Sequence, residues 1–398
     1  MMLSVAEARA RILAPLRATA SELVSVAEAW GRVTAQPVHA RLTQPPADVS
    51  AMDGYAVRAA DAHAGAALRV VGSAPAGRPF AGAVGPGEAV RLFTGSVVPP
   101  GADTVVLQED ADRRGEIVAI TEAAQAGRHI RQIGQDFATG DLVLSAARRL
   151  NARDIGLAAA ANHPWLTVHR QPRIAILATG DEISMPGEPV GSGGIVSSNA
   201  HALAAMVRAA GGVPVVMPIA RDERSAIAAV ADALSGIDLL VTTGGASVGD
   251  HDLVQSGLAE RGFELDFWRI AMRPGKPLLY GRLGPVPVLG LPGNPVSAII
   301  CAVLFLLPAV EVLSGLEAVA PPTERAALGV NDHRADHLRA TLELDAAGGL
   351  SVRPFARQDS GLLGLLARAD ALILRPPHAP ALPTGALVDV VRLRTLGV

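Results

Sequence analysis

The chain contains a single lysine, Lys276, among 35 basic residues, so the other 34 are arginines. A compact ammonium on a flexible stem can enter a tight anion pocket that a planar guanidinium cannot. Lys276 is therefore a candidate for a position where arginine will not serve, although one lysine could also survive by chance. It follows Arg273 by three residues, where a predicted strand runs into a Pro-Gly turn. Two cations on a rigid turn predict an oxyanion clamp, and the alternative is a pair of solvated surface charges.

Three glycine-containing loops follow predicted strands, at residues 178–183, 242–252 and 291–297. Glycine lets backbone N–H groups approach an anion closely, and each loop leads toward a helix N-terminus, which favours negative charge. Any one of them could be ordinary turn chemistry. Three at one sheet edge favour a phosphorylated ligand. None of them is a GxGxxG fingerprint or a P-loop.

Carboxylates lie at or just after the same strand ends, at Asp181, Glu182, Asp222, Asp250 and Asp252. Carboxylates beside a phosphate would repel it unless a hard cation lies between them, so this arrangement predicts bound Mg²⁺. Any one acid could instead be a helix N-cap, and Asp252 fits that role best. His251 could act as a base, but an exposed loop position fits it better.

A second group of polar residues lies far from the first along the chain. Asp53 stands in the segment SAMDGYA beside Tyr55, one of only two tyrosines. Thr94 stands in FTGS, and Asp136 follows later. Each is an ordinary turn signal by itself, and the three are suggestive together.

The elements that must hold the first group alternate between strands and helices. Strands are expected at residues 173–178, 213–219, 238–241 and 286–291. Helices are expected at residues 198–210, 225–234, 252–261 and, as one long apolar helix, 295–313. This alternation predicts a parallel sheet with right-handed crossovers. Such sheets bind ligands beyond the carboxyl ends of their strands.

Around this part the chain reads as helical, then β-rich, then helical again, and it ends in a β-like region. Helices are expected at residues 5–16, 21–29 and 148–162. Short strands are expected at residues 68–72, 89–93, 104–107, 117–121, 337–344, 350–354, 371–374 and 386–393. The predicted fold class is multi-domain α/β plus β. Its parts are a discontinuous helical linker domain (1–47 and 128–168), an inserted β-rich domain (48–127), a parallel-sheet α/β domain (169–318) and a C-terminal β-barrel-like domain (319–398).

Composition narrows the classes of function. The net charge is −3 with no basic stripe, which argues against a nucleic-acid partner. The first residues lack the pattern of a secretory signal, so a cytoplasmic location is expected. The longest uninterrupted apolar run, 298–310, is shorter than the roughly 20 residues that span a bilayer, and it predicts a buried helix rather than a membrane span. Cys301, the only cysteine, lies in that run and is expected to be a small buried residue.

Taken together and in chain order, the motifs resemble those of one known family. SAMDGYA, FTGS, TGDE, SSN, TTGGASVGD, MRPGKP and LPGNPVSA match the pattern of the molybdopterin molybdenumtransferases, that is, bacterial MoeA and the E domain of gephyrin-like proteins. The C-terminal segments QDSG and LARAD fit as well. The resemblance runs from about residue 5 to residue 395.

The resemblance implies a reaction. Members of the family take adenylylated molybdopterin and molybdate, cleave the pyrophosphate bond with Mg²⁺, release AMP and leave molybdenum on the pterin dithiolene. They are elongated homodimers in which the α/β domain of one subunit and the β-rich domain of the other share the active site. The implied partners also include the upstream adenylyltransferase and downstream maturation factors of molybdoenzymes.

The resemblance also assigns roles to residues. The implied catalytic residues are Asp53, Thr94, Glu182, Asp222, Asp250 and Lys276, and Glu182, Asp222 and Asp250 would hold the metal. The implied substrate-binding residues are Asp136, Thr179, Gly180, Asp181, Ser198, Thr243, Gly244, Gly245, Ser247, Arg273, Pro292, Gly293, Asn294, Pro295, Ser297, Arg334, Arg339 and Ser360.

Two residues depart from the family pattern, and two other functions remain as alternatives. Arg273 stands where the family usually has lysine, and Ala246 stands where valine or threonine is common. One alternative is the preceding step, adenylylation of molybdopterin by a related α/β domain. The other is a pterin-binding scaffold without catalysis. The β-domains with MDGYA and PGKP argue against the first, and the intact acids with Lys276 argue against the second.

Overall fold

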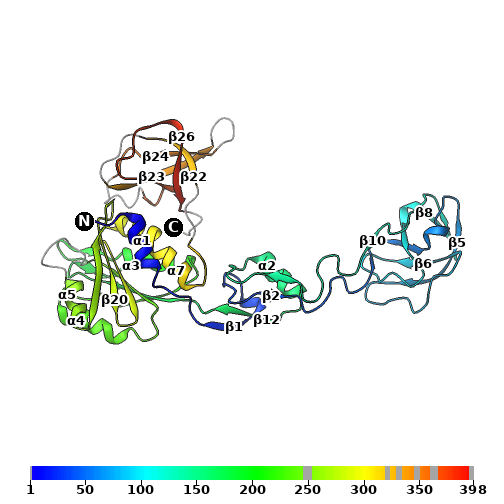
Figure 1. The fold of residues 1–398 in the computed structure, drawn as a ribbon, viewed down its shortest axis with the longest axis horizontal. Helices are drawn as coiled ribbons and strands as arrows, with labels where there is room; N and C mark the ends of the chain where they lie inside the picture. Colours follow the sequence, from blue (N-terminus) through cyan, green and yellow to red (C-terminus); the bar gives the residue numbers. More distant parts are fainter. Residues whose placement is uncertain are drawn as a thin grey trace.

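The computed structural model describes residues 2–244, 253–318, 323–328, 334–344, 350–358 and 366–393. The molecule is long and uneven (Figure 1). The α/β domain and the C-terminal β-domain lie together at one end. A thin linker leads from them to the β-rich domain at the other end.

A six-stranded sheet forms the α/β domain. Its order is β16 (Val213–Val216), β13 (Arg173–Ala178), β17 (Leu239–Thr243), β21 (Val286–Leu291), β20 (Pro277–Leu283) and β18 (Phe263–Arg269). The first four strands run parallel, as predicted. Strand β20 runs antiparallel to both of its neighbours, so the expectation of a wholly parallel sheet is wrong at that edge. Strands β20 and β21 are joined by a short hairpin at Gly284, and such a connection allows only antiparallel pairing.

Helices cover both faces of this sheet because strands such as β13 are apolar on both sides. In β13, Ile174 and Ile176 face one core cluster, and Ala175 and Leu177 face the other. The first cluster is covered by α1 (Val5–Leu13), α3 (Asn199–Ala209), α6 (Pro295–Cys301) and α7 (Leu307–Leu313). The second is covered by α4 (Arg224–Val230) and α5 (Leu253–Ala259).

The long apolar helix is confirmed as a core helix. Among the described residues, Pro295–Leu313 is the one helix long and apolar enough to cross a membrane, and 89% of its most apolar window is buried inside the protein. Between α6 and α7 it contains a π-helical turn, Ala302–Leu306. Pro308 has no N–H group for the carbonyl one turn earlier, so a widened turn there is expected. Cys301 is buried, as predicted.

Helix α1 begins at Ser4, whose side chain and Glu7 form a capping box. The helix contributes Ala8 and Ile12 to the core of the α/β domain. The prediction grouped residues 1–47 with the linker, and these core contacts move α1 out of it. The other predicted domain limits stay predictions.

The linker consists mainly of short paired strands. Its pairs are β1 (Ser21–Ser25) with β12 (Trp165–His169), β2 (Val38–His39) with β11 (Leu142–Leu144), and β3 (Val49–Ser50) with β10 (Ile130–Arg131). Its only α-helix among the described residues is α2 (Ala152–Ala160). The predicted helix at 21–29 is wrong: only Val26–Glu28 forms a 3₁₀ turn. The apolar residues of 21–25 pair with β12 instead, so a tertiary contact overrides local preference.

The β-rich domain is a six-stranded sheet that confirms the four predicted strands and adds two. Its order is β7 (Thr104–Leu107), β4 (Gly54–Val57), β6 (Glu88–Leu92), β5 (Ala67–Ala74), β9 (Ile117–Ile120) and β8 (Ala111–Arg114). Strand β4 lies between β6 and β7 and carries the end of the SAMDGYA motif.

The C-terminal domain is a closed barrel, as predicted. Its strands are β22 (Thr323–Leu328), β23 (Ala335–Leu344), β24 (Leu350–Pro354), β25 (Ala371–Arg375) and β26 (Leu382–Arg392). Strand β23 pairs with both β24 and β25, which closes the ring. The short strand β19 (Met272–Arg273) of the α/β domain pairs with β23, so the two domains share backbone hydrogen bonds.

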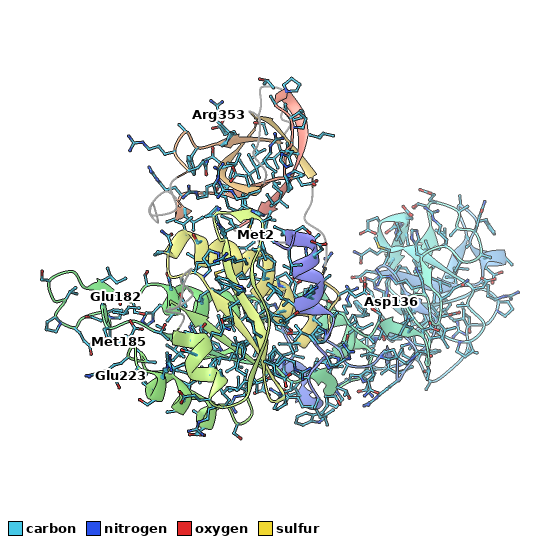
Figure 2. The ribbon with its side chains drawn as sticks, turned by 60° about the vertical axis from the view of Figure 1, so that its left-hand side comes forward. Met2, Asp136, Glu182, Met185, Glu223 and Arg353 are labelled. Atoms are coloured by element: carbon cyan, nitrogen blue, oxygen red, sulfur yellow. The ribbon has the colours of Figure 1, made fainter. Side chains whose placement is uncertain are left out.

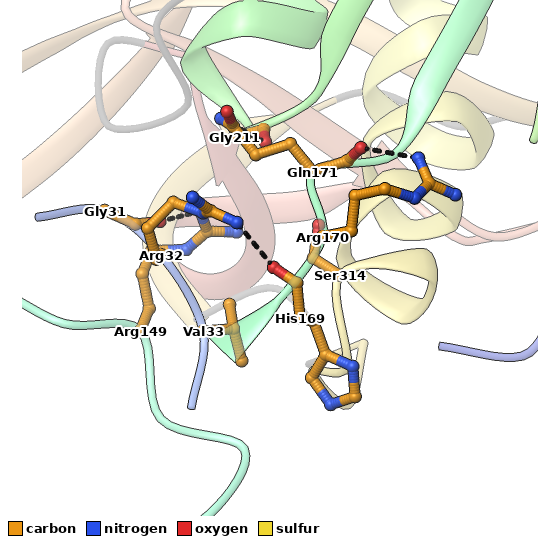
Figure 3. Close-up of a pocket in the computed structure, with 9 residues that line it drawn as sticks. All are labelled: Gly31, Arg32, Val33, Arg149, His169, Arg170, Gln171, Gly211 and Ser314. Carbon is orange, nitrogen blue, oxygen red and sulfur yellow. Dashed lines mark hydrogen bonds between the residues drawn. The ribbon is translucent and has the colours of Figure 1, made fainter. Parts of the chain in front are cut away.

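Arginine side chains form hydrogen bonds at the junction between the linker and the α/β domain (Figure 3). Arg149 donates to the carbonyl oxygens of Gly31, at 3.2 Å, and Ala210, at 2.9 Å. Arg32 donates to the carbonyl of His169 at 2.9 Å. Of these hydrogen bonds, the one from Arg149 to Ala210 ties the base of the linker to the end of α3, and the other two hold the base of the linker together.

Candidate active site

The loops after β13 and β17 meet at one edge of the sheet. The Thr179 N–H donates to the carbonyl of Thr243 at 3.2 Å, and the Gly180 N–H donates to the carbonyl of Ala220 at 3.2 Å. The chain leaves β13 toward β16 on one side and later enters β17 on the other side. The two loops therefore diverge at a topological switch point, the position where open α/β sheets bind ligands.

Asn199, the first residue of α3, joins these loops to the third one. Its side-chain amide donates to Thr243 Oγ1 and to the carbonyl of Gly293, both at 2.8 Å. Asn199 was not among the predicted site residues, although it is the asparagine of the SSN motif beside Ser198. Its position between two glycine loops could be recognised only from the fold.

Buried polar atoms point to a ligand at this edge. Within the described part of the chain, Thr179 Oγ1, Thr242 Oγ1 and Asn199 Oδ1 are buried without a hydrogen-bond partner. Unpaired buried polar groups are costly, and in a binding site a ligand can supply the missing partners. Among the other predicted residues, Asn294 caps α6 by accepting from the Val296 N–H, and Pro295 is in the first turn. Pro292 and Ser297 flank this turn. Gly245, Ser247 and Asp250 lie outside the described residues.

Three of the predicted acids of this edge, Asp181, Glu182 and Asp222, are described and exposed, whereas Asp252, like Asp250, lies outside the described residues. Asp181 Oδ1 accepts from the backbone N–H of Asp222 at 3.2 Å, so these two residues are adjacent. The carboxylate of Glu182 folds back over Gly180, where an added Cβ would lie 2.6 Å from Glu182 Oε2. Asp181 and residues of the 183–188 segment line an open pocket of about 740 Å³. Figure 2 shows Glu182, Met185 and Glu223 on this flank of the molecule.

These acids fit Mg²⁺ only in part. Oxygen ligands are what Mg²⁺ prefers, and it usually binds through one or two carboxylates together with substrate phosphates. No group of three His, Cys, Asp or Glu side chains in the described ranges is placed to hold a metal by itself. Glu182 and Asp222 can thus contribute to a site that needs phosphate oxygens as well.

The turn that carries Lys276 is packed against the core. Gly275 lies over Cys301, and a Cβ on Gly275 would be 2.6 Å from the Cys301 sulfur. The carbonyl of Lys276 accepts from the Ile270 N–H at 3.1 Å. The Lys276 side chain is exposed, and its ammonium makes no hydrogen bond or ion pair with the residues that the structure describes. It is thus a cation on a fixed backbone.

Arg273 has a different environment from the predicted one. Its guanidinium forms an ion pair with Asp336 of the C-terminal barrel at 2.8 Å, and half of the Arg273 side chain is exposed. A clamp made of Arg273 and Lys276 would have to compete with this carboxylate. Arg269, which was not predicted, lies next to the turn: it pairs in register with Pro277 and stacks on Trp268 at 3.7 Å.

Two residues of the second predicted group, Asp53 and Thr94, lie in the β-rich domain beside strands β4 and β6, and the third, Asp136, lies in the linker. Thr94 donates to Asp53 Oδ1 through its backbone N–H, at 2.7 Å, and through its hydroxyl, at 2.8 Å. These two hydrogen bonds lower the pKa of Asp53 below its usual value, and the nearby charge of Arg91 adds to them. Asp136, in the linker, is exposed and lies on the side of the molecule away from Glu182 (Figure 2). The structure of one chain therefore separates the two predicted groups.

The predicted residues of the C-terminal barrel are described in part. Arg339 is fully buried, and its Nε donates to the side-chain oxygen of Gln358 at 3.2 Å. Arg334 lies just before β23, and Ser360 is outside the described residues. Their part in binding molybdate stays a prediction.

Comparisons with known proteins agree on one family along the whole chain. Residues 3–162 match the MoeA N-terminal region (domain I and II), residues 175–312 match a probable molybdopterin binding domain, and residues 325–393 match the MoeA C-terminal region (domain IV). A molybdopterin molybdenumtransferase of Nostoc sp. is 36% identical, over 94% of this chain and 89% of its own length.

The chain belongs to the MoeA family. A molybdopterin molybdenumtransferase of Haemophilus influenzae is 30% identical over 98% of both chains. The crystal structure of a MoeA protein from Pyrococcus horikoshii superposes with a TM-score of 0.85 at 25% identity, over 98% of this chain and all of that one. The elongated arrangement is thus the MoeA fold.

One buried titratable group lies at the junction of this MoeA chain's α/β and C-terminal domains. His337 follows Asp336 on β23 and is buried. Burial lowers the pKa of His337 to about 4, against smaller opposing effects of Asp336 and of a hydrogen bond with the backbone of Arg273. The imidazole is therefore neutral in the folded protein at neutral pH.

We predict that this histidine makes the junction sensitive to acid. An unfolded histidine takes up a proton near pH 6.5, whereas folded His337 does so only near pH 4. Stability is therefore full above pH 6.5 and falls between these values, by about 2 kcal/mol on going from pH 7 to pH 5. Urea unfolding at the two pH values should show this loss in the wild type and in His63→Gln, whose histidine is exposed. His337→Leu should lose less, and an equal loss in all three would contradict the prediction.

Proposed function

We propose that this chain is a molybdopterin molybdenumtransferase that inserts molybdate into adenylylated molybdopterin and releases AMP. The observation that carries the proposal is the match to MoeA enzymes along nearly the whole chain. The described site agrees with it, since glycine loops suited to phosphates lie beside acids and a lysine. We also propose that it acts in the cytoplasm, after an adenylyltransferase and before the factors that mature molybdoenzymes.

The α/β edge would bind the pterin and its pyrophosphate. Phosphate oxygens would accept from backbone N–H groups of the loop after β21 and from the buried hydroxyls of Thr179 and Thr242. Glu182, Asp222 and Asp250 would hold Mg²⁺, which when bound neutralises charge that develops at the cleaved P–O bond. The chain's own contribution is to fix the pyrophosphate against this edge.

Lys276 would hold the molybdate dianion. Its backbone lies in a turn that packs against Cys301, so binding of the oxyanion has to order the lysine side chain but not the turn. Arg269 is beside it, and Arg273 can join only by loosening its ion pair with Asp336. Because Lys276 has no ion pair to break, it would bind the oxyanion more readily than Arg273 does.

We further propose that the functional unit is a homodimer. Strand β6 of the β-rich domain, which Thr94 closely follows, lies at the opposite end of the molecule from β20, which Lys276 directly precedes (Figure 1). Asp53 accepts from Thr94 and so lies at the same end as β6. One chain cannot bring these groups to one substrate while the linker keeps its direction. A second chain, related by a twofold axis, can place its β-rich domain on the α/β edge of the first.

Product analysis tests the reaction and the role of Lys276. With adenylylated molybdopterin, we expect AMP release that requires both molybdate and Mg²⁺. Lys276→Ala should lower the molybdate-dependent rate about 100-fold or more while nucleotide binding persists. Arg282→Ala, which removes an exposed cation from β20, the strand that follows Lys276, is the matched control and should act normally.

Two results would contradict these assignments separately. Pyrophosphate release from ATP and molybdopterin would indicate the adenylylation step. Normal turnover by Lys276→Ala would remove the oxyanion role of this lysine but leave the reaction intact.

Mixing of inactive variants tests the shared site. Asp53→Ala and Lys276→Ala each damage one half of it, in different domains. If the site is shared between subunits, a mixed dimer keeps one intact site, so an equimolar mixture after exchange should recover about a quarter of wild-type activity. Recovery should be absent if each chain builds its own site. Mixing two preparations of Lys276→Ala is the control.

A further inference from the structure

Arg91 on β6 lies among the residues that flank Asp53 and Thr94. Its guanidinium carbon is 5.1 Å from the ring centre of Tyr55 and 5.0 Å from that of Phe93. Cations attract the faces of aromatic rings at such distances. Aromatic residues make up only 3% of the chain, so two rings at one arginine are a distinctive arrangement.

The same guanidinium makes two hydrogen bonds around Asp53. It donates to the carbonyl of Gly54 at 3.1 Å and to the side-chain oxygen of Gln108 at 2.5 Å. Gln108 in turn donates its backbone N–H to the carbonyl of Asp53 at 3.1 Å. Arg91 is therefore linked to the backbone of Asp53 and Gly54, directly at the Gly54 carbonyl and through Gln108 at the Asp53 carbonyl.

Phe93 connects Arg91 to Thr94. Phe93 precedes Thr94 in the turn, and its backbone N–H donates to Ser96 Oγ at 3.1 Å. Although the Phe93 ring is 39% exposed, it has a cation on one face. A ring fixed in this way also fixes the peptide that presents the N–H and the hydroxyl of Thr94 to Asp53.

We propose that Arg91 is a positioning residue that sets the geometry of the Asp53–Thr94 pair for the reaction. It contacts the residue after Asp53 and the residue before Thr94, and it touches neither of the two side chains. Because Thr94 donates twice to Asp53 Oδ1, the second oxygen, Oδ2, stays available. The proposal rests on the proposed function, in which Asp53 acts on substrate.

The charge of Arg91 adds an effect that can be measured. It favours the ionised form of Asp53 and lowers the pKa of that group, after the two Thr94 hydrogen bonds. The other charged group of this cluster is Glu109, which accepts from the Gln108 amide at 3.1 Å. Removal of Arg91 takes away the charge that favours the ionised form, so the pKa of Asp53 should rise.

Kinetics of Arg91→Gln and Arg91→Lys separate charge from geometry. Arg91→Gln should lower kcat about 10- to 100-fold with little change in the KM for molybdate. In the profile of kcat against pH, the acid limb of this variant should move to higher pH. Arg91→Lys keeps the charge but not the two-armed hydrogen bonding, so its acid limb should stay at the wild-type pH while kcat falls. Arg69→Gln is the matched control, since Arg69 lies on the adjacent strand and, in the described ranges, forms its ion pair with Glu88 at the surface.

Hydrogen exchange gives a readout that needs no turnover. In the full-length protein, Arg91→Gln should speed exchange in the peptide that contains Thr94, and Arg69→Gln should not. Unchanged exchange would overturn the proposal, and so would faster exchange with wild-type kcat and pH profile. If the wild type itself shows no molybdate-dependent AMP release, the proposed function fails, and hydrogen exchange still decides whether Arg91 holds the pair.

Discussion

Close contact between the backbones of two loops is the constraint on which the α/β half of the site depends. Gly244 has a φ of +94°, and a Cβ there would collide with the carbonyl oxygen of Thr179. Only glycine meets both conditions without strain. The loops after β13 and β17 therefore meet, and Asn199 adds the loop after β21 through its amide. The cost of this packing is a set of buried hydroxyls without partners, which are the groups that a phosphorylated ligand can satisfy.

A second layer of backbone contacts holds the lysine turn. The Ala271 N–H donates to the carbonyl of Leu3, and the Ala335 N–H donates to the carbonyl of Ala271, both at 2.8 Å. The N-terminal segment, the turn and the C-terminal barrel are thus joined in one ladder. The β-rich domain has no such attachment to the α/β domain in the described structure and is reached only through the paired strands of the linker. This contrast is why a second chain is the natural source of the Asp53–Thr94 pair.

Local sequence patterns predicted where helices and strands form better than they predicted which segments contact each other in the fold. Continuous apolar runs identified strands such as β13 and β21, because strands buried on both faces carry no polar alternation. The helix expected at 21–29 failed because pairing with β12, about 140 residues away, decides that segment. The loops of the α/β edge were predictable because glycine marks positions where the backbone needs a conformation or a close approach that other residues disfavour, and this can be recognised from the sequence alone. Asn199 and the contact of Arg273 with Asp336 were not, since both depend on which elements the fold brings together.

The contacts of several arginines and of the single lysine differ in a way that accounts for the choice of residue at these positions. Arg170 binds Asp238 with two hydrogen bonds, Arg149 spans two backbone carbonyls, and Arg273 reaches Asp336. These are tasks for a planar group with several donors. Lys276, in contrast, has no such partner among the described residues, and its turn is fixed by packing rather than by its charge. An ammonium kept apart from carboxylates retains its full attraction for an incoming dianion. At these three positions arginine holds parts of the protein together, whereas Lys276 leaves its cation available to a ligand.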